Sequence, residues 1–303
     1  MKEKVTKESI KSNYIINLDA LSALKDFPEN LFDSCITSPP YYGLRDYHHE
    51  SQIGREDSPE AYLNNLVEVF RQVRRVLKED GSLWLVIGDL YASTKSKEER
   101  PAYKPKDLMG LPWQLALKLR EDGWYLRSDI IWHKENAMPE SCRDRPTRSY
   151  EHIFLLTKSK SYYYNYDALA KPLAESSKRR YLSAVGKDNK YMNEKSGMKR
   201  QSLNEPRNRN DYTEDTIPKK RNARDIWTIN TSAFRGKHYA SFPPKLVKTC
   251  ILAGCPENGL ILDPFMGSGT VGMVAKKMSR QYIGIEINRD YCQLAKKRIE
   301  EGR

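Results

Sequence analysis

A glycine-rich turn near the C-terminal end of the chain has the residue types that bind a nucleotide-like cofactor. Residues Leu262–Thr270 read LDPFMGSGT, in which a short apolar strand runs into a tight turn and then a helix. Glycines at such a turn let the backbone approach a ligand closely and present helix N-terminal amides to it. Gly267, Gly269 and Gly272 fit the spacing GxGxxG, and Glu286 ends the next strand, where it could bind ribose hydroxyls. The pattern fits a tight strand-to-helix turn without a ligand as well.

Two features favour S-adenosylmethionine over a dinucleotide at this turn. Asp263 stands before the glycines, where a carboxylate could hold the positively charged amino group of a methionine moiety. No second nucleotide-binding half follows Glu286, so strands from the N-terminal half must complete the site. The candidate cofactor-binding residues of this region are Asp263, Pro264, Phe265, Gly267, Ser268, Gly269, Thr270 and Glu286.

A second candidate site lies in the N-terminal half, where an expected strand over 32–37 ends at Ser38-Pro39-Pro40-Tyr41. The two prolines fix the backbone and cannot continue a strand. The Ser38 hydroxyl and the Pro39 carbonyl can accept both hydrogens of an exocyclic amine, while Tyr41 stacks on the planar heterocycle that carries it. The alternative is a proline-terminated strand with surface tyrosines and no ligand.

Short β-branched runs alternate with amphipathic helices around both motifs, which indicates a doubly wound, mostly parallel α/β sheet. Ser58 and Pro59 mark the start of a long helix, which we expect Gly81 to end before a strand over 82–87. Further strands are expected over 14–16, 125–132, 153–157, 260–262 and 282–285, and helices over 113–121, 246–252, 269–278 and 289–300.

Basic charge is concentrated between the two halves of this core. The chain of 303 residues has a formal net charge of +12, and seventeen basic and eight acidic residues lie between Lys158 and Arg224. Because this segment is rich in tyrosine and poor in periodic apolar residues, we expect an irregular insertion over 158–235 within a core formed by 1–157 and 236–303. Either a polyanionic partner or ordinary solubility explains the charge.

Composition also excludes several classes of protein. A mean hydropathy of -0.76 and the lack of any apolar run of about 20 residues exclude a membrane-embedded protein. Five scattered cysteines without a CxxC pair argue against a zinc site, so we expect no metal. They also favour a reducing compartment. No apolar segment follows the basic N-terminal residues, so we expect no signal peptide and a cytoplasmic location.

Taken together, the two motifs resemble those of the amino-group DNA methyltransferases, and specifically the beta-ordered subgroup that methylates cytosine N4. In that subgroup a catalytic motif, here Ser38–Tyr41, precedes the cofactor motif, here Leu262–Thr270. Adenine enzymes of the family usually carry Asp in place of Ser38, so Ser favours cytosine, with N6-adenine methylation as the alternative. Further matching segments are Trp84–Asp89, Ile131–Glu140, Arg148–Glu151 and His238–Pro243.

The resemblance implies a methyltransferase fold with permuted motif order, S-adenosylmethionine as cofactor, and a double-stranded DNA substrate whose target base is flipped out. It also implies a restriction–modification setting with a cognate endonuclease as functional partner, in which the enzyme is a monomer or a homodimer. Asp19 would lie near the cofactor adenine, although it suits a helix N-cap equally well, and Ser241 and Phe242 would line the methionine pocket. Region 158–235 would recognise the target sequence, with candidate DNA contacts at Arg179, Arg180, Arg207 and Arg209. Lys134, in the core, is a further candidate for a phosphate contact.

Two rival functions come from other classes of protein. A nicotinamide-dependent oxidoreductase would use the glycine turn but leaves Ser38–Tyr41 unexplained. A non-catalytic DNA-binding module would need the basic region alone. Cytosine C5 methylation is not expected, because that chemistry requires a cysteine nucleophile in a Pro-Cys dipeptide, which this sequence lacks.

Overall fold

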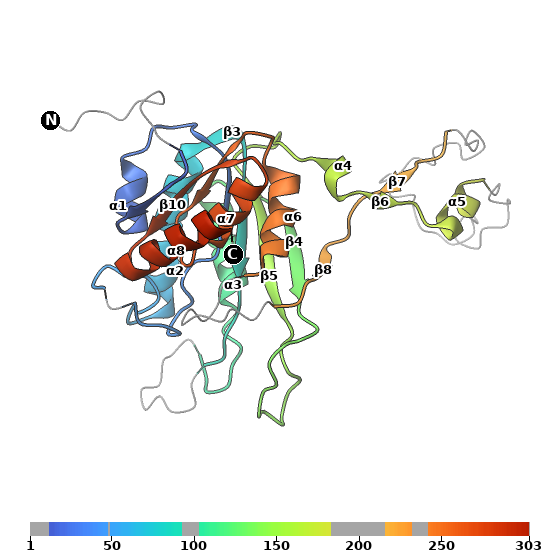
Figure 1. The fold of residues 1–303 in the computed structure, drawn as a ribbon. Coiled ribbons are helices and arrows are strands. Elements are labelled where there is room, and N and C mark those ends of the chain that lie inside the picture. Colours follow the sequence, from blue (N-terminus) through green and yellow to red (C-terminus); the bar gives the residue numbers. More distant parts are fainter. Residues whose placement is uncertain (1–11, 48, 93–102, 183–215, 232–241, 303) are drawn as a thin grey trace. The chain divides into compact units, whose positions relative to one another are not determined.

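The structure is a computed structural model that describes residues 12–47, 49–92, 103–182, 216–231 and 242–302 (Figure 1). Its main feature is an eight-stranded sheet in the order β1-β10-β9-β2-β3-β5-β4-β8. All strands of this sheet run parallel except β5. The strands are β1 (Tyr14–Asn17), β2 (Phe32–Thr37), β3 (Leu77–Ile87), β4 (Tyr125–His133), β5 (Tyr150–Thr157), β8 (Ile226–Thr228), β9 (Leu260–Asp263) and β10 (Gln281–Glu286).

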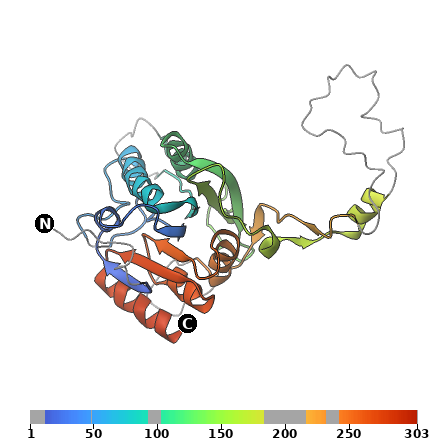
Figure 2. The ribbon, with the colours of Figure 1, turned by 90° about the horizontal axis from the view of Figure 1, so that it is seen from above.

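Helices cover both faces of the sheet, so the doubly wound α/β fold expected from the sequence is confirmed (Figure 2). One face carries α1, α2 and α3, which pack against one another in that order, and the other face carries α6, α7 and α8. Their bounds are α1 (Ala20–Lys25), α2 (Pro59–Val76), α3 (Leu111–Glu121), α6 (Pro244–Gly254), α7 (Thr270–Lys277) and α8 (Arg289–Glu301). No helix in the described ranges is long and apolar enough to cross a membrane.

Helix α2 begins where the sequence predicts but ends earlier. Ser58 accepts a hydrogen bond from the Ala61 amide at 3.1 Å as N-cap, and Pro59 occupies the first turn. The expected end at Gly81 is wrong, because the helix stops at Val76 and β3 begins at Leu77. Leu77 is fully buried and pairs with Phe32 of β2. Pairing with the neighbouring strand therefore ends the helix, and Gly81 lies within β3.

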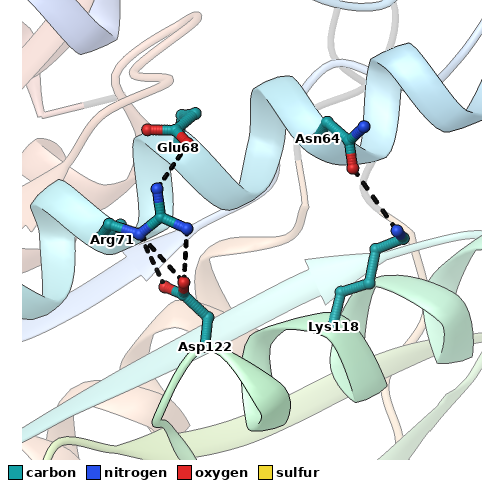
Figure 3. Close-up of polar contacts among 5 residues, drawn as sticks. All are labelled: Asn64, Glu68, Arg71, Lys118 and Asp122. Carbon is teal, nitrogen blue, oxygen red and sulfur yellow. Dashed lines mark hydrogen bonds and ion pairs between the residues drawn. The ribbon is translucent and has the colours of Figure 1, made fainter.

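Charged side chains join α2 to α3 on the molecular surface (Figure 3). Arg71 donates from Nε and Nη2 to Asp122 Oδ1 at 2.9 and 2.5 Å, and it also binds Glu68. Lys118 donates to Asn64 at 3.4 Å. Exposed pairs of this kind contribute about 0 to 1 kcal/mol each, so the packing of the apolar face of α2 dominates the free energy of this contact.

The chain divides into two compact units, Met1–Asn165 with Arg224–Arg303, and Tyr166–Ala223. The second unit contains α4 (Tyr166–Leu169), α5 (Glu175–Leu182) and a two-stranded sheet of β6 (Lys171–Pro172) and β7 (Lys220–Arg221). The first unit includes residues that the sequence assigns to the insertion over 158–235. The backbone amide of Asn165 donates to Ala253 at 2.8 Å, and β8 pairs with β4 at the edge of the main sheet.

Candidate active site

A cavity of about 750 Å³ lies in the first unit, at the carboxyl ends of the parallel strands of the main sheet. The residues that follow β1, β2, β9 and β10 line it, together with the last residues of β4 and the start of antiparallel β5. The carboxyl ends of parallel strands meet at one edge, which is where α/β sheets bind ligands. Both motifs contribute to this wall: Ser38, Pro39, Pro40 and Tyr41 from the first, and Pro264, Phe265, Gly267, Ser268 and Thr270 from the second.

The Ser38–Tyr41 turn is held on both sides by tyrosine hydroxyls. Tyr62 of α2 is 1% exposed and donates to the Pro40 carbonyl at 2.9 Å. Tyr41 donates to Glu151 Oε2 at 2.7 Å. Burial, and secondly the charge of Glu151, raise the pKa of Tyr41 well above its usual value, so its hydroxyl keeps its proton. The turn is thus fixed at two atoms beside the cavity.

Lys134 lies in the wall of the cavity and forms an ion pair with Glu151. Its Nζ is 4.2 Å from the centroid of a Trp132 ring, a cation–π contact. The Lys134 and Glu151 side chains are 17% and 18% exposed, respectively. This geometry does not favour the phosphate contact expected for Lys134, because the ammonium already has a carboxylate partner inside the site.

Asp263 lies behind the cavity wall rather than in it. Its carboxylate is 2% exposed and accepts hydrogen bonds from Thr37 Oγ1 at 2.7 Å and the Phe265 amide at 3.1 Å. Burial raises its pKa to about 7. The carboxylate therefore joins the end of β2 to the glycine turn after β9, and any effect on a bound amino group is exerted from the second layer.

Glu286 ends β10 and faces the cavity with its carboxylate bound to backbone amides. Oε2 accepts from the Gly267 amide at 2.7 Å, and Oε1 accepts from the Asn288 amide at 2.8 Å. Burial raises the pKa of Glu286. Gly267 and Gly269 have φ of +50° and +81°, a left-handed conformation that favours glycine. The sequence thus places glycines at the positions of the turn that require them.

Arg298 of α8 binds the glycine turn through Ser268 and Thr270, a contact that the sequence does not predict. Its Nη1 donates to the Ser268 carbonyl at 2.8 Å, to Ser268 Oγ at 2.7 Å and to Thr270 Oγ1 at 3.2 Å. The Ser268 and Thr270 side chains are therefore engaged with the protein and hold the turn in shape. The cost of burying the Arg298 guanidinium lowers its pKa.

The remaining candidates fall into three groups. Asp19 is the N-cap of α1, accepting from the Ser22 amide at 2.9 Å, and it also lines the cavity, as Phe242 does. Arg179 is exposed on α5. Ser241, Arg207, Arg209 and the Arg180 side chain lie outside the part of the chain that the structure describes.

Asp89, at the end of β3, has a structural role. Its carboxylate accepts from the backbone amides of Leu90, Gly110 and Leu111 at 2.9, 2.9 and 3.2 Å. The bonds from Gly110 and Leu111 cap the start of α3. The sequence did not identify Tyr62, Glu151 or Arg298 as polar contacts of the candidate site, because these contacts join separate elements. Glu151 does lie in the matching segment Arg148–Glu151, but its role there was not assigned.

Comparison with known proteins identifies the relatives of this chain. A family model described as DNA methylase, of the N6/N4 type, matches residues 32–297. The chain is similar to type II methyltransferase M.SmaI of Serratia marcescens, at 42% identity over 98% of this chain and 94% of the relative. It is also 42% identical to type II methyltransferase M.Cfr9I of Citrobacter freundii, over 93% of this chain and 86% of the relative.

Solved structures share the fold. PvuII DNA methyltransferase, described as cytosine-N4-specific, superposes with a TM-score of 0.64 at 18% identity, covering 97% of this chain and 96% of that one. TTHA0409 of Thermus thermophilus, a putative DNA modification methylase solved with S-adenosylmethionine, has a TM-score of 0.62 at 21% identity, covering 95% and 93%. The methyltransferase type of the α/β fold is thereby confirmed.

Proposed function

Because this chain belongs to the DNA methylase family of the N6/N4 type, we propose that it transfers a methyl group from S-adenosylmethionine to the exocyclic N4 of cytosine in double-stranded DNA. The observation that carries the proposal is the shared cavity: the Ser38–Tyr41 turn and the glycine turn line the same space. Amine and methyl donor must meet within bonding distance, and this arrangement provides for that. Family membership leaves a nicotinamide-dependent oxidoreductase without support.

The residues around the glycine turn fit the methyl donor. Two carboxylate residues, Asp19 and Glu286, line the cavity, and Glu286 binds the amide of Gly267, so a ribose and an adenine could bind in this part of the cavity. Phe265 and Phe242 add aromatic surface, and the Asp263 carboxyl group lies behind the wall. When bound, S-adenosylmethionine supplies a methyl group already activated by a sulfonium. A solved neighbour of the same fold contains this molecule, which supports the assignment.

The protein's part in the reaction is to position the amine. The Ser38 hydroxyl and the Pro39 carbonyl accept hydrogen bonds from its two N–H groups, which draws the nitrogen towards sp³ geometry and directs its lone pair at the methyl group. Tyr41 provides a ring on which the base stacks after it leaves the duplex. Cytosine is favoured by Ser38 and by the description of PvuII methyltransferase as cytosine-N4-specific.

Mass spectrometry of digested DNA tests this proposal. Incubation of the full chain with mixed-sequence DNA and labelled S-adenosylmethionine should give N4-methylcytosine. N6-methyladenine would instead establish the alternative within the same family, and the absence of methyl transfer would leave a DNA-binding module.

Tyr41→Ala should reduce turnover at least tenfold, because the stacking surface is lost, while the affinity for S-adenosylmethionine stays within about twofold.

A further inference from the structure

The pairing of β4 with β5 places the Glu151 carboxylate against Tyr41 of the Ser38–Tyr41 turn. Glu151 of β5 pairs in register with Trp132 of β4, so both side chains lie on the same face of the sheet, and Lys134 follows Trp132 by two residues. This register explains why the Lys134 ammonium reaches both the Trp132 ring and the Glu151 carboxylate. The other carboxylate oxygen of Glu151, Oε2, accepts a hydrogen bond from the Tyr41 hydroxyl at 2.7 Å.

The end of β3 is shaped to admit this arrangement. A Cβ atom at Gly88 would lie 2.9 Å from Tyr41 Cε2 and 3.2 Å from the Glu151 carboxyl carbon. The phenol ring and the carboxylate therefore pack directly on the Gly88 backbone. The ring has a wall on one side and a hydrogen-bond acceptor at its tip, so its plane is fixed.

We propose that Glu151 is a positioning residue of the methyl transfer, which holds the Tyr41 ring in the plane that stacks on the extruded base, with Lys134 as its counter-charge. The inference rests on the proposed function, because a fixed ring plane matters only where a planar base must be aligned with the methyl donor. The Glu151 side chain is 18% exposed, and the Lys134 ammonium pairs with its carboxylate. A misaligned base would still bind, but its amine would point away from the methyl group.

A double-mutant cycle tests the proposal. Tyr41→Phe keeps the stacking ring and removes only the hydroxyl, whereas Glu151→Gln keeps the shape and removes the charge. We expect each variant to slow single-turnover methylation about tenfold, with the dissociation constants for DNA and S-adenosylmethionine within about twofold of wild type. The double variant should be no slower than the slower single variant, because the residue at position 151 has no phenol hydroxyl left to hold once Tyr41→Phe has removed it.

The matched control is Glu140→Gln, which removes a carboxylate that pairs with Arg145 and does not line the cavity. It should leave the methylation rate unchanged. Wild-type rates in Tyr41→Phe, or losses that multiply in the double variant, would overturn the role of Glu151. If Glu151→Gln lowers the melting temperature strongly, Tyr41→Phe still decides the question, because it keeps the ring and the charges. A wild-type chain that transfers no methyl group would instead refute the proposed function.

Discussion

Burial of the Asp263 carboxyl group makes the stability of this protein depend on pH. Burial raises the pKa of Asp263 from 3.8 to about 7, so the folded state holds this proton more tightly than the unfolded state does. The contribution to stability is complete below about pH 4 and is lost as the pH rises through 7. Over that interval the loss is at most about 4 kcal/mol.

Asp263→Asn should therefore raise the free energy of unfolding at pH 8 and flatten its dependence on pH between 5 and 8. The amide oxygen still accepts from Thr37, so the packing is kept. At pH 8, where the Asp263 carboxyl group is ionised, the same variant should weaken S-adenosylmethionine binding, because the negative charge behind the cavity is lost. Urea unfolding at several pH values measures the first effect and calorimetry the second. If the free energy of unfolding depends on pH as it does in the wild type, Asp263 does not titrate between pH 5 and 8.

Glu286 is the residue through which cofactor affinity should be most easily changed. Its carboxylate faces the cavity and fixes the Gly267 amide, so Glu286→Ala removes both the proposed ribose acceptor and the support of the turn. We expect the dissociation constant for S-adenosylmethionine to rise about tenfold or more, because hydrogen bonds to a charged group contribute about 1.5 to 3 kcal/mol. Exposed Glu257→Ala is the control. Equal affinities in calorimetry would place the cofactor elsewhere.

At the scale of elements, the contact between α6 and β3 tolerates no added side chain. A Cβ atom at Gly254 would lie 2.1 Å from Nε1 of the buried Trp84 indole. Gly254→Ala must push the helix from the sheet, and we expect a loss of about 2 to 3 kcal/mol in the free energy of unfolding. Lys248→Ala on the exposed side of α6 should change it by less than about 0.5 kcal/mol. Equal melting temperatures would mean that α6 moves at little cost.

Elements with a local signal were predictable, and those formed by pairing were not. Ser58 and Pro59 mark the start of α2 because capping is chemistry within one turn. The end of α2 depends on the pairing of Leu77 with Phe32, which lies 45 positions earlier in the chain, so local pattern could not locate it. Strand β8 covers three residues and exists through its pairing with β4. Glu151 escaped detection as a contact of Tyr41 for the same reason.

At the scale of the whole molecule, strand order explains how two distant motifs form one site. β2 and β9 are adjacent, with Ser34 opposite Ile261 and Cys35 opposite Leu262. The turns that follow them therefore begin side by side, although they lie more than 220 residues apart in the sequence. The Thr37–Asp263 hydrogen bond joins their ends. The order of the two motifs along the chain could be read from the sequence. Their adjacency in space depends on the pairing of β2 with β9, which the sequence did not predict.

Basic residues of the second unit should supply attraction to DNA phosphates. Replacing both Arg179 and Arg180 by Ala should weaken DNA binding and reduce the magnitude of the slope of log affinity against log salt by up to about two. The reason is that binding releases about one counterion fewer for each phosphate contact that is lost. Fluorescence anisotropy at several salt concentrations measures the slope. Lys276→Ala with Lys277→Ala on α7 removes the same charge from the first unit and is the control. An unchanged slope would remove these arginines from the interface.

We propose that the inserted region expected over 158–235 reads the target sequence, and the unit Tyr166–Ala223 gives the segment to exchange. Arg and Asn side chains there can read base edges in the major groove, whereas a merely basic segment adds affinity without sequence preference. Exchange of 166–223 for the matching segment of a relative with another target leaves every residue that lines the cavity in place. The chimera should therefore bind S-adenosylmethionine as before and methylate the relative's site, as read by methylome sequencing. An active chimera that keeps the original site would locate recognition outside this segment, and activity at both sites would mean that the two units share it.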